Sequence, residues 1–234
     1  MNRLITAGCV LALGLSLPIQ AADDKDNPAV KKLDRNIPRH QDFLKRIEQS
    51  KGAGDVIFLG DSITHGWEGQ KAWQEHFGSF NPVNLGISGD QTGHVLWRIT
   101  DGHELDTLKP KAAVIMIGTN NTGGHTAEQI AGGIEAIVKE VRKQKPGAKV
   151  LLLAIFPRSE KPDAPQRAKI KQINDIIAKL DDGKAVFFKD IGPGFLDPKG
   201  GLPGEVMPDY LHLSPKGYDL WGKAIKADLE KLVK

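Results

Sequence analysis

The chain is predicted to be an α/β protein, one domain built on a five-stranded parallel sheet with helices on both faces. Segments of strand and of helix character alternate along its 234 residues, in the order that a parallel sheet requires. The strand candidates are apolar on both faces, as strands buried between two helical layers are. No repeat, low-complexity tract or linker interrupts this pattern, which favours a single domain.

Five strand candidates set the frame of this domain. Each is short and mainly apolar and stops before a glycine, a proline or a charged residue, and the third is the clearest. In chain order, the strands are expected at residues 55–59, 82–85, 112–117, 150–156 and 185–188.

Helices are expected before, between and after these strands, because apolar residues recur there at helical spacing. Pro38 sets the start of the first helix, Thr126 can cap the clearest one, and Pro215 suits the first position of the last. In chain order, the helical segments are expected at residues 34–50, 70–77, 94–99, 126–145, 165–180 and 214–234.

The domain is expected to span residues 34–234, after a signal peptide at residues 1–22 and a flexible, charged leader at residues 23–33. Arg3, an apolar stretch and a small-residue cleavage site are typical of secretory signals, so a secreted or periplasmic location is expected. The stretch is too short to cross a bilayer, and no integral membrane segment is expected after processing. Cys9, the one cysteine, would leave with the signal; a retained anchor is the alternative.

The charge balance restricts the class of partner. The chain carries 32 basic and 29 acidic residues, a formal net charge of +3. This surplus is too small to indicate a nucleic acid or an anionic membrane as the partner. A small-molecule or carbohydrate ester is the expected partner, and the oligomeric state is left open.

Polar residues follow the strand candidates directly, and they should meet at one edge of the sheet. Ligands of open α/β sheets bind there, beyond the carboxyl ends of the strands. Ser62 follows the first strand, Gly89 the second and Asn120 the third. The fifth strand leads into a loop rich in glycine and proline, and then to Asp209 and His212. The order of these residues predicts one site assembled from separate segments.

These residue types are those of acyl transfer to serine. His212 can take the proton of Ser62, and Asp209 can orient the imidazole if one helical turn joins the two residues. These three form the candidate catalytic triad. A tetrahedral oxyanion needs fixed N–H donors, and the candidate hole consists of the backbone N–H groups of Ser62 and Gly89 and the side-chain amide of Asn120.

Four motifs in this order make the chain resemble the SGNH, or GDSL-type, hydrolases. They are Gly-Asp-Ser-Ile-Thr at 60–64, Asn-Leu-Gly-Ile-Ser-Gly-Asp at 84–90, Gly-Thr-Asn-Asn at 118–121 and Asp-x-x-His at 209–212. The resemblance covers most of residues 54–222 and looks closest to the catalytic subunits of the intracellular platelet-activating-factor acetylhydrolases. It implies a flavodoxin-like three-layer α/β/α fold, esterase activity and no cofactor.

Each candidate residue also has a structural alternative. Ser62 could cap a helix, Gly89 could serve only its turn, and Asn120 could exchange roles with Asn121. A group of large side chains, more often found in cores, could line an acyl or sugar subsite: Trp67, Trp73, Trp97, Phe156 and Met207. No histidine pair has a zinc-binding spacing, so no metal is expected.

The sequence therefore predicts a secreted serine esterase or acylhydrolase that cleaves short-chain, mainly acetyl, esters through an acyl-serine intermediate. Export favours acetylated carbohydrates as substrates. One alternative is a short-acyl phospholipid acetylhydrolase, acting on compounds like platelet-activating factor, or a lysophospholipase. An acyltransferase and a non-catalytic carbohydrate-binding module on the same fold are the others.

Overall fold

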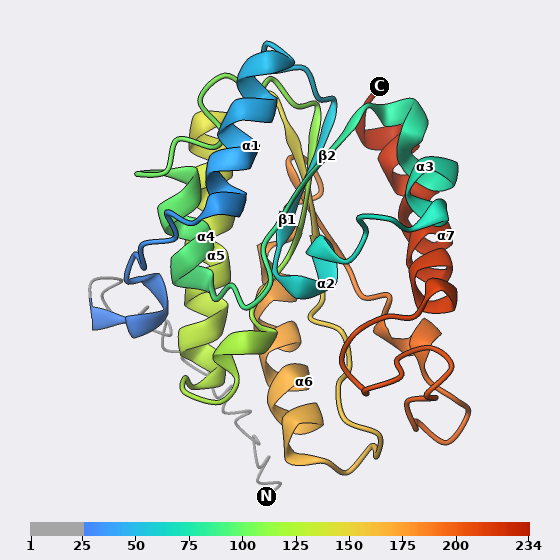
Figure 1. Ribbon diagram of the computed structural model, residues 1–234. Helices are drawn as coiled ribbons and strands as arrows, with labels where there is room; N and C mark the ends of the chain where they lie inside the picture. Colours follow the sequence, from blue (N-terminus) through green and yellow to red (C-terminus); the bar gives the residue numbers. More distant parts are fainter. Residues whose placement is uncertain (1–25) are drawn as a thin grey trace, which may run out of the picture.

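The computed structural model describes residues 26–234 and confirms the predicted α/β fold. Its five strands form one parallel sheet in the order β2-β1-β3-β4-β5, which is the flavodoxin-like order. The strands are β1 (Val56–Gly60), β2 (Pro82–Gly86), β3 (Ala112–Met116), β4 (Lys149–Leu153) and β5 (Val186–Lys189). Figure 1 shows the sheet between two layers of helices.

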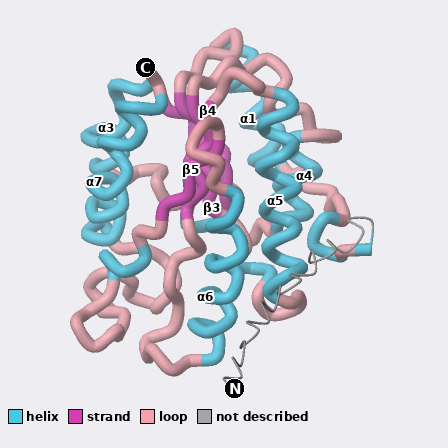
Figure 2. The backbone as a smooth tube through the Cα atoms, turned by 180° about the vertical axis from the view of Figure 1, so that it is seen from behind, coloured by secondary structure: helices cyan, strands magenta, loops and turns pink. Residues whose placement is uncertain are grey.

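Helices cover both faces of the sheet, as Figures 1 and 2 show from opposite sides. On one face lie α1 (Pro38–Gln49), α4 (Thr92–Ile99), α5 (Ala127–Gln144) and α6 (Pro165–Ile177). On the other lie α3 (Lys71–Phe77) and α7 (Pro215–Leu232), with the short α2 (Ser62–His65) at the end of β1.

Both faces of the strands are apolar because each face contacts its own core. In β1, Ile57 and Leu59 belong to the core under α1, α4, α5 and α6. Val56 and Phe58, which alternate with them, belong to the core under α3 and α7. This second core also holds Trp67, at 0% exposure. Successive side chains of a strand point to opposite faces, which explains the continuous apolar runs.

The predicted helix starts agree with the structure. α1 begins at Pro38. The hydroxyl of Thr126 accepts a hydrogen bond of 3.2 Å from the backbone N–H of Gln129 and caps α5. Ser214 caps α7, whose first residue is Pro215. Thr126 and Ser214 each satisfy an N–H group that has no partner within the first turn of its helix, and a proline at the first position has no N–H to satisfy.

β4 is shorter than the apolar run predicts. It was expected to reach residue 156, but it ends at Leu153. Beyond it, the side chain of Asn174 in α6 donates to the carbonyl of Ile155 at 3.0 Å and accepts from its N–H at 2.9 Å. A side-chain amide thus takes the place of a neighbouring strand, and the ladder stops.

The leader also differs from the expectation of a flexible segment. Its described part, residues 26–33, is docked on α4 and α5, and Ala29 is 2% exposed. The hydroxyl of Thr92 donates to the carbonyl of Ala29 at 2.7 Å, and the N–H of Leu33 donates to the carbonyl of Gly93 at 3.1 Å. A Cβ at Gly93 would lie 2.2 Å from the carbonyl oxygen of Lys31, so glycine permits this approach.

The predicted signal peptide, residues 1–22, lies outside the described residues. Among residues 26–234, no helix is both long enough and apolar enough to cross a membrane.

Candidate active site

Ser62 is placed by a tight connection between β1 and α2. β1 ends at Gly60, and Asp61 caps α2, accepting a hydrogen bond of 3.0 Å from the N–H of Ile63. Ser62 is the first residue of α2, so the alternative in which Ser62 itself caps the helix does not apply. The hydroxyl of Tyr218, from α7, donates to the carbonyl of Ile63 at 2.8 Å and ties α2 to that helix.

A continuous chain of contacts joins Ser62, His212 and Asp209. The hydroxyl oxygen of Ser62 lies 2.9 Å from Nε2 of His212. Nδ1 of the same ring lies 2.6 Å from Oδ2 of Asp209. The side chains of His212 and Asp209 are 46% and 56% exposed, so this end of the site is open to solvent. Such an arrangement allows an imidazole to take a proton from serine while a carboxylate orients the ring.

The Asp209–His212 pair is joined by a turn, and the expected helical turn is wrong. The second carboxylate oxygen of Asp209 accepts hydrogen bonds from the backbone N–H groups of Leu211, at 3.1 Å, and His212, at 2.7 Å. Tyr210, between them, has a φ of +57°, which a helix does not contain. An aspartate that accepts from its following backbone is a common way to close a turn.

The same contacts act on the charge of Asp209. Partial burial alone would raise the pKa of this carboxyl, but the hydrogen bonds from the ring and backbone of His212 and from Leu211 outweigh it and lower the pKa below the usual range. Asp209 therefore stays ionised in neutral solution and can stabilise a positively charged imidazole.

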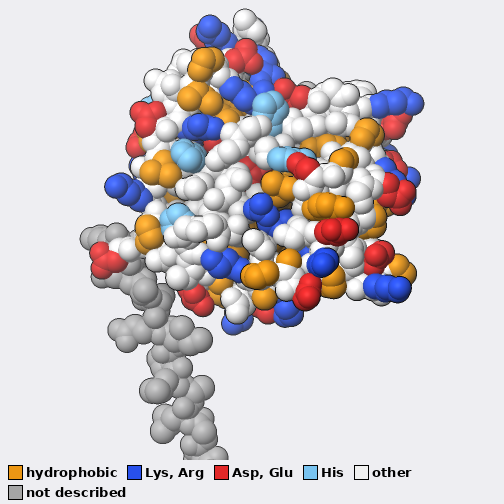
Figure 3. Space-filling model, turned by 60° about the horizontal axis from the view of Figure 1, so that its bottom comes forward, with side chains coloured by type: hydrophobic (Ala, Val, Ile, Leu, Met, Phe, Trp, Pro, Cys, Tyr) orange, Lys and Arg blue, Asp and Glu red, His pale blue; other side chains and the backbone are white. Residues whose placement is uncertain are grey.

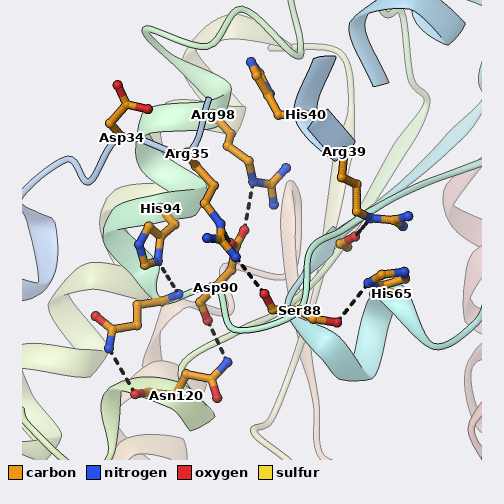
Figure 4. A network of polar contacts seen from close by, with 12 residues as sticks. Asp34, Arg35, Arg39, His40, His65, Ser88, Asp90, His94, Arg98 and Asn120 are labelled. Atoms are coloured by element: carbon orange, nitrogen blue, oxygen red, sulfur yellow. Dashed lines mark hydrogen bonds and ion pairs between the residues drawn. The ribbon is translucent and has the colours of Figure 1, made fainter. Parts of the chain in front are cut away.

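Gly89 and Asn120, the other candidate oxyanion donors, lie in the loop after β2 and the turn after β3. Gly89 has a φ of +82°, a conformation that favours glycine. The side-chain amide of Asn120 donates to the carbonyl of Asp90 at 2.9 Å, as Figure 4 shows, so one residue connects the two segments. An amide nitrogen carries two hydrogens, and this contact uses one of them.

The two neighbouring asparagines have different surroundings. Asn121 is buried, and its side chain accepts from the N–H of Thr92 at 3.1 Å and donates to the hydroxyl of the same residue at 3.2 Å. Asn121 thus fastens the start of α4, whereas Asn120 faces the loop of Gly89. The alternative in which the two exchange roles is not favoured.

Asp61 places a second carboxyl group beside Ser62, but inside the protein. It is fully buried, and its Oδ2 has no hydrogen-bond partner among the described residues. Burial raises the pKa of Asp61 to about 7; the hydrogen bond from Ile63 opposes the rise, and the nearby charge of Asp90 adds to it.

The large side chains considered for a substrate subsite belong mostly to the core. Trp67, Phe156 and Met207 are at most 2% exposed, and Trp73 and Trp97 are partly buried. Figure 3 shows the face of the molecule at the carboxyl ends of the strands, where histidines lie among charged side chains of both signs and scattered apolar ones. Within residues 26–234, no group of three or more metal-ligating side chains is close enough to hold a metal ion.

Several residues around the site were not anticipated from the sequence. Tyr218 holds α2, Arg35 and Arg98 hold the side chain of Asp90, and Ser88 contacts Nδ1 of His65 at 2.9 Å. Each contact joins segments that are distant along the chain or lie on different elements. Local patterns of residue type therefore carry no signal for them.

The chain is similar to known acylhydrolases. Residues 58–220 match the model of the GDSL-like Lipase/Acylhydrolase family. Over 180 residues, the chain is 41% identical to the human platelet-activating factor acetylhydrolase IB subunit alpha1, covering 76% of this chain and 77% of that one. A solved Streptococcus pneumoniae structure, described under the name of platelet activating factor, superposes with a TM-score of 0.68 at 29% identity, covering 82% and 91% of the two chains.

A member of a carbohydrate acetylesterase family from Sinorhizobium meliloti shares the fold, with a TM-score of 0.59 at 19% identity over 77% of this chain and 99% of that one. Identity at that level establishes a common fold and leaves the substrate of this chain open.

The expected secreted or periplasmic location is wrong by the same comparisons. The curated relatives are subunits of the intracellular platelet-activating-factor acetylhydrolases, and nothing in the comparisons supports export. The N-terminal pattern of charge and apolar residues was its only basis. The preference for acetylated carbohydrates, which was inferred from export, loses its support with it.

The family match spans more than half of the chain, and the sheet order and the relatives agree with it. The chain belongs to the GDSL-like lipase/acylhydrolase family and is a carboxylic ester hydrolase.

Proposed function

We propose that the protein hydrolyses short-chain esters, acetyl esters above all, through an acyl intermediate on Ser62. The observation that carries the proposal is the chain of contacts from Ser62 to His212, 2.9 Å, and from His212 to Asp209, 2.6 Å. These lengths are within hydrogen-bond range, so no rearrangement is needed before proton transfer.

In the proposed reaction, the hydroxyl oxygen of Ser62 attacks the ester carbonyl carbon while Nε2 of His212 takes the hydroxyl proton. The negative oxygen of the tetrahedral intermediate is held by the N–H groups of Ser62 and Gly89 and the amide of Asn120. The alcohol leaves with the proton from His212. A water molecule, deprotonated by the same imidazole, then attacks the acyl carbon. The bond from this carbon to the oxygen of Ser62 breaks, the carboxylic acid leaves, and His212 returns the proton to Ser62.

The acyl group and the alcohol are proposed from the relatives. Relatives named platelet-activating factor acetylhydrolase subunits, at 41% identity, support an acetyl group and a phospholipid-like alcohol. The exposure of His212 and Asp209 is compatible with this alcohol, because a large leaving group can remain outside the protein. No specific contact of the described residues favours a sugar.

The first test compares wild type, Ser62→Ala and the control Ser50→Ala on p-nitrophenyl acetate, butyrate and octanoate. Ser50 is exposed, and its hydroxyl donates only to the carbonyl of Ile47, at 3.0 Å. Wild type and the control should prefer acetate, and Ser62→Ala should lose about 10⁴-fold or more in kcat. A fluorophosphonate probe should label wild type but not Ser62→Ala. Substantial turnover by folded Ser62→Ala would refute the mechanism.

The second test separates the leaving groups. Release of acetate is measured from a 1-alkyl-2-acetyl-glycerophosphocholine and from acetylated xylo-oligosaccharides under the same conditions. The proposal requires a higher kcat/KM for the phospholipid. A higher value for the oligosaccharides would replace the phospholipid-like alcohol by a sugar and leave the serine mechanism intact.

A further inference from the structure

Two arginines from different parts of the chain meet on the carboxylate of Asp90, the residue after Gly89. Nε of Arg98, in α4, donates to Oδ2 at 2.8 Å. Nε of Arg35, in the segment that precedes α1, donates to Oδ1 at 2.8 Å. The Asp90 side chain is fully buried. Figure 4 shows the two guanidinium groups approaching Asp90 from separate elements.

The Arg98 contact is part of a buried ionic chain. Arg98 also pairs with Glu104, and Glu104 lies 2.8 Å from Nδ1 of His40 in α1. The four side chains that it joins, from Asp90 to His40, are at most 2% exposed. Removing one partner from such a group leaves an uncompensated buried charge, which destabilises the folded protein strongly. A substitution of Arg98 would therefore destabilise the fold, and its effect on the site could not be measured separately.

Arg35 can be replaced without leaving a fully buried charge unpaired, because Arg98 remains on Asp90 and the side chain of Arg35 is itself 23% exposed. Besides contacting Asp90, its Nη2 donates to the carbonyl of Ser88 at 2.7 Å. One guanidinium thus holds the residues on both sides of Gly89. The same Nη2 lies 3.8 Å from the position that a Cβ of Gly89 would take, so it is in direct contact with this turn.

Resting on the proposed function, we propose that Arg35 is a positioning residue for the oxyanion hole. Gly89 has no side chain that could hold its backbone in place, so the direction of its N–H group depends on the positions of Ser88 and Asp90. The carbonyl of Asp90 also accepts the hydrogen bond from Asn120. By holding Asp90 and Ser88, Arg35 sets the positions of two of the three proposed donors.

Loss of Arg35 should therefore lower kcat and leave binding of the unreacted ester nearly unchanged. Loss of one oxyanion donor costs about 10²–10³-fold in kcat, and displacement of a reacting group by about 1 Å can cost about 10²-fold. Arg35→Ala leaves Arg98 on Asp90, so a partial displacement is expected: a fall in kcat of about 10–100-fold with KM within about twofold.

The test compares Arg35→Ala, Arg35→Lys and Lys32→Ala in the full chain, with p-nitrophenyl acetate as substrate. Lys32 is the matched control, since it lies in the same N-terminal segment and pairs with Asp101 at the surface, away from the loop of Gly89. Arg35→Lys should fall between wild type and Arg35→Ala, because one ammonium replaces a fork with two directed donors. Methylguanidinium added to Arg35→Ala should restore part of kcat, and Lys32→Ala should match wild type.

A second readout reports on the oxyanion itself. The inhibition constant of a trifluoromethyl ketone with a methyl group should rise in Arg35→Ala by the same factor as kcat/KM falls, because both depend on binding of the tetrahedral oxygen. A kcat for Arg35→Ala within twofold of wild type would overturn the inference. An equal loss in Lys32→Ala, combined with no recovery of Arg35→Ala by methylguanidinium, would also overturn it, because undocking of the segment would then account for the loss without the guanidinium group. Activity in Ser62→Ala is a separate result, and it would refute the proposed function instead.

Discussion

Asp61 carries a carboxyl group that folding removes from water, and this makes the stability of the protein depend on pH. The side chain is fully buried, and only Oδ1 has a hydrogen-bond partner among the described residues, the N–H of Ile63. Burial raises the pKa of Asp61 to about 7, whereas an unfolded aspartate has a pKa of about 3.9. Between these values, the folded protein keeps a proton that the unfolded chain has lost.

Because the folded state binds more protons in this range, the free energy of unfolding falls as pH rises from about 4 to about 7. A pKa difference of about three corresponds to about 4 kcal/mol, all of which is lost above pH 7. Asp61→Asn keeps the oxygen that accepts from Ile63 and removes the titration. Its buried amide hydrogens add a cost of about 1–3 kcal/mol that does not vary with pH.

The variant is therefore expected to gain about 4 kcal/mol relative to wild type between pH 4 and pH 8, whatever its stability at the acid end. Urea unfolding followed by tryptophan fluorescence at pH 4, 6 and 8 measures this difference. Asp55→Asn is the control, since Asp55 is 43% exposed and pairs with Lys111 at the surface. If the free energies of Asp61→Asn and wild type run parallel across this range, Asp61 is ionised in the folded protein and the reasoning is wrong.

Three other substitutions test the contacts around the site. Asp209→Asn should lower kcat by about 10⁴-fold, because an amide neither holds the His212 ring in its tautomer nor stabilises the positively charged ring. Steady-state rates on p-nitrophenyl acetate measure this loss, and a loss below tenfold would contradict the role of Asp209 in orienting His212. Tyr218→Phe should lower the free energy of unfolding by about 1–3 kcal/mol in urea, since the carbonyl of Ile63 loses its side-chain donor. Trp67→Ala should cost about 3–5 kcal/mol in the same assay, because it empties the centre of an aromatic cluster; a cost under 1 kcal/mol would mean that the cluster collapses freely.

The fold could be predicted from the sequence because its signals are local. The central strands β1 and β3 are continuous apolar runs, and Pro38, Thr126 and Pro215 mark helix starts by their own chemistry. The end of β4 could not be predicted in this way. It depends on Asn174, which is nineteen residues further along the chain and meets Ile155 only after α6 has packed on the sheet.

The candidate site was predictable in composition and less so in geometry. The residue types at 62, 209 and 212 indicate a serine, a carboxylate and an imidazole, and the contacts join these side chains. Asp209 and His212 are joined by a turn and not by the expected helical turn. One carboxylate oxygen of Asp209 contacts the His212 ring, and the other accepts from the backbone of the turn. A spacing of three residues suits a helix and this turn equally, so spacing alone could not distinguish them.

The N-terminal segment shows why composition can mislead near a site. Residues 26–33 are charged and lack helical spacing, which favoured a loose leader, yet backbone contacts with α4 dock them. This docking carries Arg35 to the loop of Gly89, 53 residues from its partner Ser88 in sequence. If the inference about Arg35 holds, the rate of ester hydrolysis depends on a segment that supplies no reacting group. Removing residues before Asp34 should then lower kcat as Arg35→Ala does, whereas a shortened chain with wild-type kcat would mean that α1 alone places Arg35.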